Sequence, residues 1–307
     1  MKNSELVNTK EHGVGVSFGT FGELLQGVLK DDRAFLVTLP ISKHSRAVFT
    51  PDSLKQKVDV YPKFKQKAVR LCETILKHYR LPLGGSLEIH SDLPIGKGLA
   101  SSTADLVATS RAVEDAFGIN INITDLQSYL ADIEPSDGVM YPGIVSFYHK
   151  EVQLKEYLGS CPPLTIVCLD EGGVVDTVKF NKVGIRYSAY QKKEYSLLLE
   201  QLTDAIKMND IETVGKISTR SAMLHQKISP KNYLYKMIDI NKKIKGLGVI
   251  IAHSGTYIGI LLSSLDLNYE KKLSEATKLI KDISGEVSIM YSNYDMKSEV
   301  PYDPQYN

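Results

Sequence analysis

The sequence predicts an α+β fold with two lobes, and three observations lead to that class. Apolar residues alternate with polar ones through much of the first third of the chain, which is the period of a strand with one buried face. Farther along, apolar residues recur at the spacing of amphipathic helices. Helices and strands do not alternate regularly, so we expect largely antiparallel or mixed sheets rather than a doubly wound parallel sheet. The 307 residues suffice for one large domain or two joined lobes.

The first third of the chain should hold several strands and one helix. Turn-forming residues separate its apolar segments, and a lysine- and glutamate-rich face accompanies the helical stripe. We expect strands at 13–29, 33–41, 45–50 and 84–94, and a helix over 64–79.

The rest of the chain is expected to be mainly helical, with strands returning near its end. Gly118 stands where a glycine commonly stops a helix, and Glu134-Pro135 stops the next one. We expect helices at 102–117, 124–133, 196–206, from 211 through 217 and onward, 232–246 and 271–283, and strands at 143–149, 164–170, 247–264 (two strands and a turn) and 286–292.

Charge and cysteine content exclude several function classes. The 37 basic and 36 acidic residues give a net charge of +1, so no global field favours a nucleic acid partner. Two lysine clusters, at 63–67 and 242–245, are interpreted as solvated helix faces. The three cysteines show no C-x-x-C spacing, which argues against a disulfide framework or a zinc site. Of these, Cys72 and Cys168 should be core residues.

The sequence also predicts a protein without a membrane partner. The N-terminus is polar and lacks the apolar segment of a signal peptide, and no run approaches the ~18 apolar residues of a membrane helix. We therefore expect a cytoplasmic protein.

The stretch "PIGKGLASSTAD", residues 94–105, is the clearest candidate for a binding site. Small residues between a strand and a helix N-terminus present backbone N–H groups to one point, where the helix dipole favours an anion such as phosphate. Ser102 and Asp105 have the S-x-x-D spacing of a helix start, which makes Ser102 a candidate N-cap. The stretch fits neither the Walker A nor the G-x-G-x-x-G pattern, and an ordinary glycine-containing turn is the alternative.

Three segments in order resemble the motifs of the GHMP kinases, the family of galactokinase, homoserine kinase and mevalonate kinase. "PIGKGLASSTA" (94–104) is similar to the second motif, "GTFGELLQG" (19–27) to the first and "AHSGTYIGILL" (252–262) to the third. The resemblance implies an N-terminal lobe like ribosomal protein S5 domain 2, a ferredoxin-like C-terminal lobe, and ATP in the cleft between them. We expect an ATP-binding lobe at 1–170, a second lobe at 171–292 and a polar tail at 293–307.

The same resemblance assigns roles to individual residues. It implies that Ser102 and Glu134 hold Mg²⁺ and that Asp137 is the base or the group that orients the hydroxyl, although the two carboxylates could exchange roles. Without the resemblance, "EPSDGVM" would be an acidic surface turn. The implied ATP-binding residues are Pro94, Gly96, Lys97, Gly98, Leu99, Ala100, Ser101 and Ser102.

Within the family, the motifs look most like the branch that phosphorylates L-threonine for cobalamin biosynthesis. This implies Mg²⁺-dependent transfer from ATP to a small hydroxyl-bearing acceptor, by a monomer or homodimer. Homoserine or serine remains an alternative acceptor, a non-catalytic nucleotide sensor is the alternative function, and His253 could instead be a hydrogen-bonded structural residue. The implied acceptor-binding residues are Glu23, His253, Ser254, Gly255 and Thr256, and Asp176 and Thr177 are further candidates.

Overall fold

The structure is a computed structural model that describes residues 10–173 and 187–292. Asp176 and Thr177, two of the candidate acceptor residues, and the tail at 293–307 lie outside the described residues.

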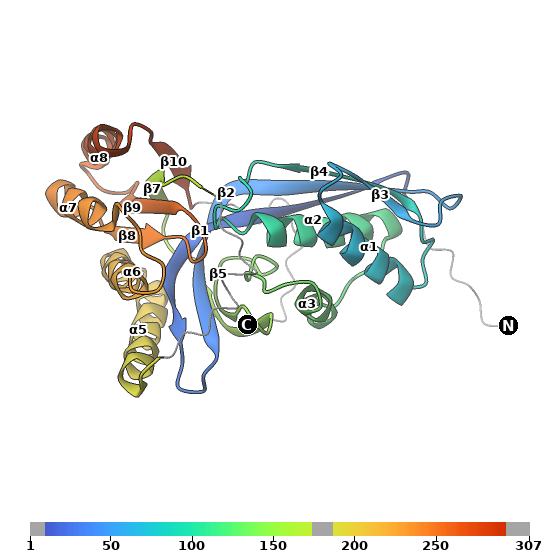
Figure 1. Cartoon of the computed structure of the whole chain (residues 1–307), viewed down its shortest axis with the longest axis horizontal. Helices are drawn as coiled ribbons and strands as arrows, with labels where there is room; N and C mark the ends of the chain where they lie inside the picture. Colours follow the sequence, from blue (N-terminus) through green and yellow to red (C-terminus); the bar gives the residue numbers. More distant parts are fainter. Residues whose placement is uncertain (1–9, 174–186, 293–307) are drawn as a thin grey trace.

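A ten-stranded sheet organises the described chain, and its strands run in the order β10-β7-β9-β8-β1-β2-β4-β3, with β5 and β6 attached to β2 (Figure 1). Pairing is antiparallel throughout this sheet except between β3 and β4. The mixed α+β class predicted from the sequence is therefore confirmed. The strands are β1 Gly13–Val28, β2 Ala34–Pro51, β3 Val58–Tyr61, β4 Gly85–Ser91, β5 Ile144–Tyr148, β6 Gln153–Gly159, β7 Leu164–Asp170, β8 Gly248–Ile251, β9 Tyr257–Ser263 and β10 Ser288–Tyr291.

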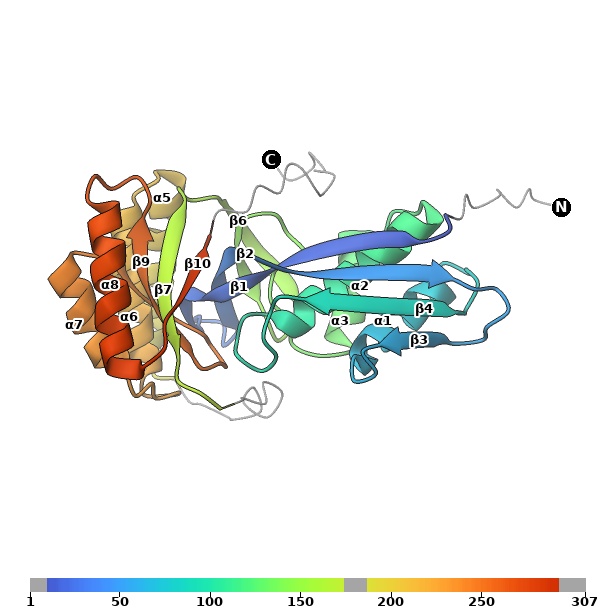
Figure 2. The same cartoon turned by 90° about the horizontal axis from the view of Figure 1, so that it is seen from above.

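Seven described helices cover this sheet. Helices α1, α2 and α3 lie on one face near β4 and β3, whereas α5 to α8 gather around β7, β8 and β9 at the other end of the molecule (Figures 1 and 2). The helices are α1 Gln66–His78, α2 Ser101–Phe117, α3 Ile123–Ala131, α5 Ala189–Lys207, α6 Ile211–His225, α7 Leu234–Ile244 and α8 Tyr269–Ser284.

Strand β1 connects the two ends of the sheet. Its first half packs so closely on α2 that a β-carbon at Gly13 would lie 2.2 Å from the carbonyl oxygen of Ala112. Its second half reaches β8 and the opposite helices, where a β-carbon at Gly27 would lie 2.5 Å from the Tyr195 ring of α5. Register shifts against β2 fall between these halves, from Phe18 to Leu25, so the strand changes course at its centre.

Alternating side chains give β7 two buried faces. Ile166 and Cys168 belong to the core beneath α5 and α6, whereas Val167 and Leu169 belong to the core beneath α7 and α8. Because both faces of β7 are covered, its sequence is the nearly continuous apolar run "LTIVCL". The position of this strand at 164–170 was predicted correctly. Cys72 is also buried, as expected.

The sequence-based elements differ from the structure mainly at short or bent strands. The segments 33–41 and 45–50 form one strand, β2, because the bulged register carries it through Pro40 and Ser42. Strand β3 was missed because only Val58 and Val60 of its four residues are buried, and β6 because it is mostly polar.

Candidate active site

The loop from β4 to α2 has a backbone that only small residues adopt easily. Gly96, Gly98 and Ala100 all have positive φ, at 70°, 77° and 58°. A left-handed conformation at three alternate positions curls the chain into a compact turn directly before the helix. The first backbone N–H groups of α2, which helices leave without internal partners, then face the loop.

Ser102 does not cap this helix, so that prediction was wrong. Helix α2 begins at Ser101, its N-cap is Ala100, and no side chain supplies a cap hydrogen bond. The Ser102 hydroxyl instead donates a hydrogen bond to Oε1 of Glu134. Asp105, the other half of the expected start signal, accepts a 2.6 Å hydrogen bond from Ser45 and pairs with Lys65. Ser102 is therefore available to a site rather than to the helix end.

The third glycine-rich segment packs directly against this loop. The backbone N–H of Thr256 donates to the carbonyl oxygen of Lys97 over 3.2 Å, and a β-carbon on Gly98 would lie 2.7 Å from that of Ala252. The Lys231 ammonium, buried between α6 and α7, donates to the carbonyl oxygen of Gly255. The loop at 94–100 and the segment at 252–256, far apart in the sequence, thus pack together, and we call the pair the double loop.

Lys97 is held at the edge of the double loop. Its ammonium lies 2.6 Å from Oδ2 of Asp170 and 2.7 Å from the carbonyl oxygen of Gly173. Thr256 donates to Oδ1 of Asp170 over 2.5 Å. Burial acts to raise the pKa of Asp170, but these hydrogen bonds outweigh it and hold the pKa below its usual value. Thr256 therefore lies on the Lys97 side of the loop.

The two carboxylates of "EPSDGVM" follow α3 in the chain. They lie on the side of Ser102 away from Lys97. Glu134 is buried, and the backbone N–H of Asp137 donates to Oγ1 of Thr103, in the first turn of α2, over 3.3 Å. Ser136, between them, donates its backbone N–H to the carbonyl oxygen of His149 over 3.0 Å. The segment is thus fixed at both ends against the first turn of α2 and the end of β5.

Burial and charge crowding raise the pKa values of two carboxyl groups here. Desolvation, and then the charge of Glu134, raise the pKa of Asp137 to about 6. Desolvation, and then the charge of Asp137, raise the pKa of Glu23 well above its usual value, opposed by a hydrogen bond from the backbone of His253. Three acidic groups from β1 and the 134–137 loop therefore share one partly dry region, which is typical of functional sites.

His253 joins the first and third motifs. Its Nδ1 lies 2.6 Å from Oε1 of Gln26, and its carbonyl oxygen lies 3.1 Å from Nε2 of His225. Burial lowers the pKa of His253 well below the usual value, with the charges of His149 and His225 acting in the same direction. A neutral His253 that bonds Gln26 fits the structural alternative for this residue, and it fixes the backbone behind Glu23.

Two lysines of the 63–67 cluster form ion pairs beside this site, and the interpretation as a solvated helix face was wrong for Lys65, whereas Lys67 is exposed as expected. Lys65 pairs with Asp105, and both side chains are largely buried, at 10% and 7% exposure. The Lys67 ammonium pairs with Oε2 of Glu134. No feature of the sequence marked Lys67, because only the packing of α1 against α2 brings residues 67 and 134 together.

The donor set at Ser102 and Glu134 fits Mg²⁺. This ion commonly uses one or two carboxylates and takes its other ligands from substrate phosphates and water. One buried carboxylate and one hydroxyl match that requirement. Within residues 10–173 and 187–292, no group of three His, Cys, Asp or Glu side chains could form an all-protein metal cage.

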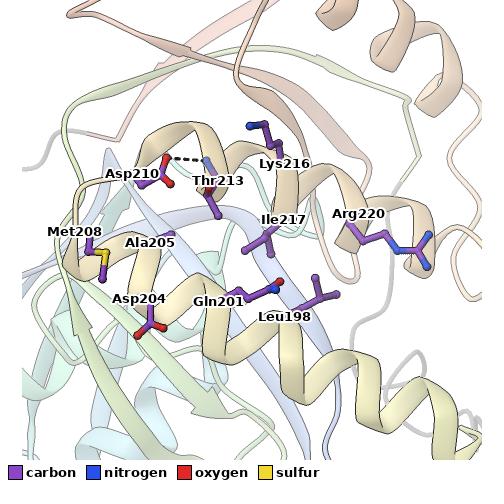
Figure 3. Close-up of a pocket in the computed structure, with 10 residues that line it drawn as sticks. All are labelled: Leu198, Gln201, Asp204, Ala205, Met208, Asp210, Thr213, Lys216, Ile217 and Arg220. Atoms are coloured by element: carbon purple, nitrogen blue, oxygen red, sulfur yellow. Dashed lines mark hydrogen bonds between the residues drawn. The ribbon is translucent and has the colours of Figure 1, made fainter.

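An open groove of about 620 Å³ lies elsewhere, between α5 and α6 (Figure 3). Apolar side chains such as Leu198 and Ile217 line it beside Asp204 and Arg220. None of its lining residues belongs to the Ser102–Glu134 site. Separately, none of the helices within the described residues is long and apolar enough to cross a membrane.

Comparisons with known proteins identify relatives of this arrangement. Residues 66–143 match the model of the GHMP kinases N terminal domain, which covers α1, the loop before α2, Ser102, Glu134 and Asp137. The L-threonine kinase of Salmonella typhimurium is 26% identical over 253 residues, covering 78% of this chain and 80% of that protein. The L-threonine kinase of Citrobacter freundii is 27% identical over 267 residues, covering 84% and 90%.

Solved structures share the fold along nearly the whole chain. The homoserine kinase of Cytophaga hutchinsonii has a TM-score of 0.72 at 14% identity, covering 95% of this chain and 97% of that one. The mevalonate kinase of L. major, in complex with R-mevalonate, has a TM-score of 0.66 at 15% identity, covering 95% and 98%.

Proposed function

We propose that this chain is a GHMP kinase that transfers the γ-phosphoryl group of ATP to the side-chain hydroxyl of L-threonine, as its similarity to that family supports. The products would be O-phospho-L-threonine and ADP. The observation that carries this proposal is the Ser102–Glu134 hydrogen bond at the N-terminus of α2, with Asp137 beside it.

ATP would be bound by the loop before α2, the segment from Pro94 to Ser102. Positive φ at Gly96, Gly98 and Ala100 turns the backbone around the space in front of the helix N-terminus. Backbone N–H groups and the helix dipole there favour the phosphates. The Lys97 ammonium would leave Asp170 and bind a phosphate oxygen, since both partners are only partly buried.

Ser102 and Glu134 would hold Mg²⁺ together with the phosphates. When bound, the ion supplies positive charge that offsets the charge developing on the transferred group. The hydrogen bond between Ser102 and Glu134 fixes the rotamers of both side chains, so each positions the other for this role.

Asp137 would accept the proton of the acceptor hydroxyl. The hydroxyl oxygen forms the new bond to the γ-phosphorus, the bond from that phosphorus to the β–γ bridging oxygen breaks, and the proton passes to the carboxylate. A pKa of about 6 leaves Asp137 ionised near neutral pH yet still basic enough to take the proton. The raised pKa also supports Asp137 as the base and Glu134 as the metal ligand, rather than the reverse assignment.

The acceptor would lie between Glu23 and the third motif. Glu23 Oε2 is buried without a hydrogen-bond partner among the described residues, although the other side of this carboxyl receives the His253 backbone N–H. A buried polar atom without a partner calls for an explanation, and a catalytic or ligand-binding role is one of them. We assign Glu23 to the ammonium of the amino acid and His253 to the wall behind it. Ser254, Gly255 and Thr256 would line the pocket on its side toward Lys97 and Asp170. The named relatives support threonine over homoserine or serine.

Steady-state kinetics with a panel of acceptors test this function. ADP release with Mg·ATP is measured for L-threonine, D-threonine, L-serine and L-homoserine. We expect the highest kcat/KM for L-threonine and no acceptor-dependent release with D-threonine. ADP release that no hydroxy amino acid stimulates, in a chain that still binds ATP, would contradict the kinase assignment for this class of acceptor and favour a sensor.

A further inference from the structure

We propose that Lys67 is a phosphate-binding residue whose ammonium neutralises Glu134 until the nucleotide arrives. In the structure the ammonium pairs with Oε2 of Glu134, the carboxylate oxygen that Ser102 does not use. The inference rests on the proposed function, because it concerns how the same site receives ATP and the metal ion.

The exposure of the two partners indicates which of them moves. The Glu134 side chain is only 6% exposed and is fixed by Ser102, whereas the Lys67 side chain is 48% exposed. Lys67 therefore covers the open side of the carboxylate with a flexible arm that solvent can reach. A cation at this position satisfies a buried charge that would otherwise have no counter-ion.

The start of α1 is anchored so that Lys67 stays within reach of the site. The neighbouring Lys65 forms a buried ion pair with Asp105 of α2, and Ala68 packs in the core. With both flanking positions fixed, the backbone of Lys67 is fixed as well. Only the side chain is free to change partners.

Each incoming ligand would compete for one partner of this ion pair: the metal ion for Glu134 and the nucleotide phosphates for Lys67. A divalent cation and the Lys67 ammonium cannot both occupy the same face of Glu134, since like charges repel. With both the metal ion and the nucleotide bound, Glu134 would hold the metal ion and Lys67 would bind a β- or γ-phosphate oxygen. The metal ion alone would bind weakly, because it must displace Lys67 without offering it a phosphate.

Metal binding without nucleotide tests the first half of the proposal. Mn²⁺ serves as the probe, and its free concentration is followed by electron paramagnetic resonance. We expect Lys67→Met to bind Mn²⁺ about tenfold more tightly than the unmodified chain, which corresponds to about 1.4 kcal/mol. Unchanged or weaker Mn²⁺ binding would overturn the proposal.

Nucleotide binding without metal tests the second half. Calorimetry in the presence of a chelator should show ATP and ADP binding about tenfold more weakly to Lys67→Met, because a charged hydrogen bond to phosphate is lost. AMP should bind as well as before. Equal affinities of the two proteins for ATP would overturn the proposal.

Two variants separate this role from damage to the fold. Lys67→Arg keeps the charge and should retain ATP affinity within about threefold. Lys77→Met removes an exposed lysine from the last turn of the same helix and should change neither affinity. Partial unfolding would weaken the binding of both Mn²⁺ and ATP. Tighter Mn²⁺ binding together with weaker ATP binding therefore indicates that Lys67 exchanges Glu134 for a phosphate.

The outcomes also separate this inference from the proposed function. A chain that binds ATP but phosphorylates no acceptor contradicts the proposed function, and the Lys67 comparison still decides the inference. A chain that phosphorylates threonine but shows no effect of Lys67→Met contradicts the inference alone. If the unmodified chain binds neither ATP nor ADP, both are overturned.

Discussion

A β-carbon on Gly255 would lie 1.9 Å from the carbonyl oxygen of Lys97, so the two loops that meet there can do so only because residue 255 is glycine. The same Lys97 carbonyl accepts the backbone N–H of Thr256, and the Gly255 carbonyl accepts the Lys231 ammonium. The segment proposed to hold phosphate is therefore shaped by a segment more than a hundred residues away.

Gly255→Ala should disrupt the loop proposed to bind phosphate. The clash involves backbone atoms on both sides, so the loops must separate, and we expect KM for ATP to rise by roughly tenfold or more. Gly285→Ala is the matched control: it introduces strain at φ 78° with open space around it, at the end of α8. That control should lose some stability and keep its KM. Equal KM values for the two variants would refute the role of the contact.

Ser102→Ala should reduce the use of Mg·ATP while leaving the fold intact. The variant removes the hydroxyl that holds Glu134, and a lost hydrogen bond to a charged group corresponds to roughly 10- to 100-fold in kcat/KM for ATP. Ser110→Ala provides the comparison, because Ser110 lies on the same helix, is buried, and has no hydrogen-bond partner for its hydroxyl among the described residues. Similar kinetics for both variants would remove Ser102 from the site.

Asp137→Asn should abolish most of the turnover and change the pH profile. The amide cannot accept the hydroxyl proton, and general-base catalysis commonly contributes roughly 100-fold or more. In the unmodified chain, kcat/KM should fall as pH drops through about 6, where Asp137 becomes protonated. The residual activity of the variant should lack that decline. If kcat/KM of Asp137→Asn still declines at acidic pH, the decline must come from the titration of another group.

The same substitution should stabilise the fold at neutral pH. Because folding raises the pKa of Asp137 from 3.8 to about 6, its contribution is fully present below pH 3.8 and is lost as pH rises through about 6. Above that pH the ionised group costs roughly 3 kcal/mol or less. Asp137→Asn should therefore raise Tm at pH 7.5 and raise it less at pH 5. A Tm gain of equal size at both pH values would contradict the link to ionisation.

Lys65→Met should strongly destabilise the fold. It leaves Asp105 buried beside Ser45 without its cation, and breaking one half of a buried pair commonly costs about 3 to 5 kcal/mol in the free energy of unfolding. The double variant Lys65→Met with Asp105→Asn should recover part of that loss, because no unpaired charge remains. Urea denaturation measures both, and a double variant no more stable than the single one would argue against the charge as the cause.

The sequence was sufficient for the parts of this molecule that depend on local pattern. Continuous apolar runs such as 164–170 located buried strands, and Gly118 marked the end of α2, where its φ is 59°. The turn at 94–100 was located for the same reason, since glycines and alanines before a helix form a local signal, and its phosphate-binding role stays a prediction.

What depends on contacts between distant segments could not be predicted. Lys65 and Lys67 look like any lysines on an amphipathic helix, and only the packing of α1 on α2 turns them toward Asp105 and Glu134. Ser102 had the spacing of an N-cap, but the N-cap is Ala100, in a left-handed conformation two residues earlier. Register shifts in β1 and β2 likewise depend on partners at both ends of the sheet.

Phosphorus NMR of the product tests the central claim most directly. The chain is incubated with Mg·ATP and L-threonine, and the proton-coupled phosphorus spectrum of the new ester is recorded. Transfer to the threonine side chain predicts a doublet, because a single proton sits on the carbon that carries the ester oxygen, and the ADP signals should grow in equal amount. Inorganic phosphate as the only new signal, or no ester with any hydroxy amino acid, would contradict the account.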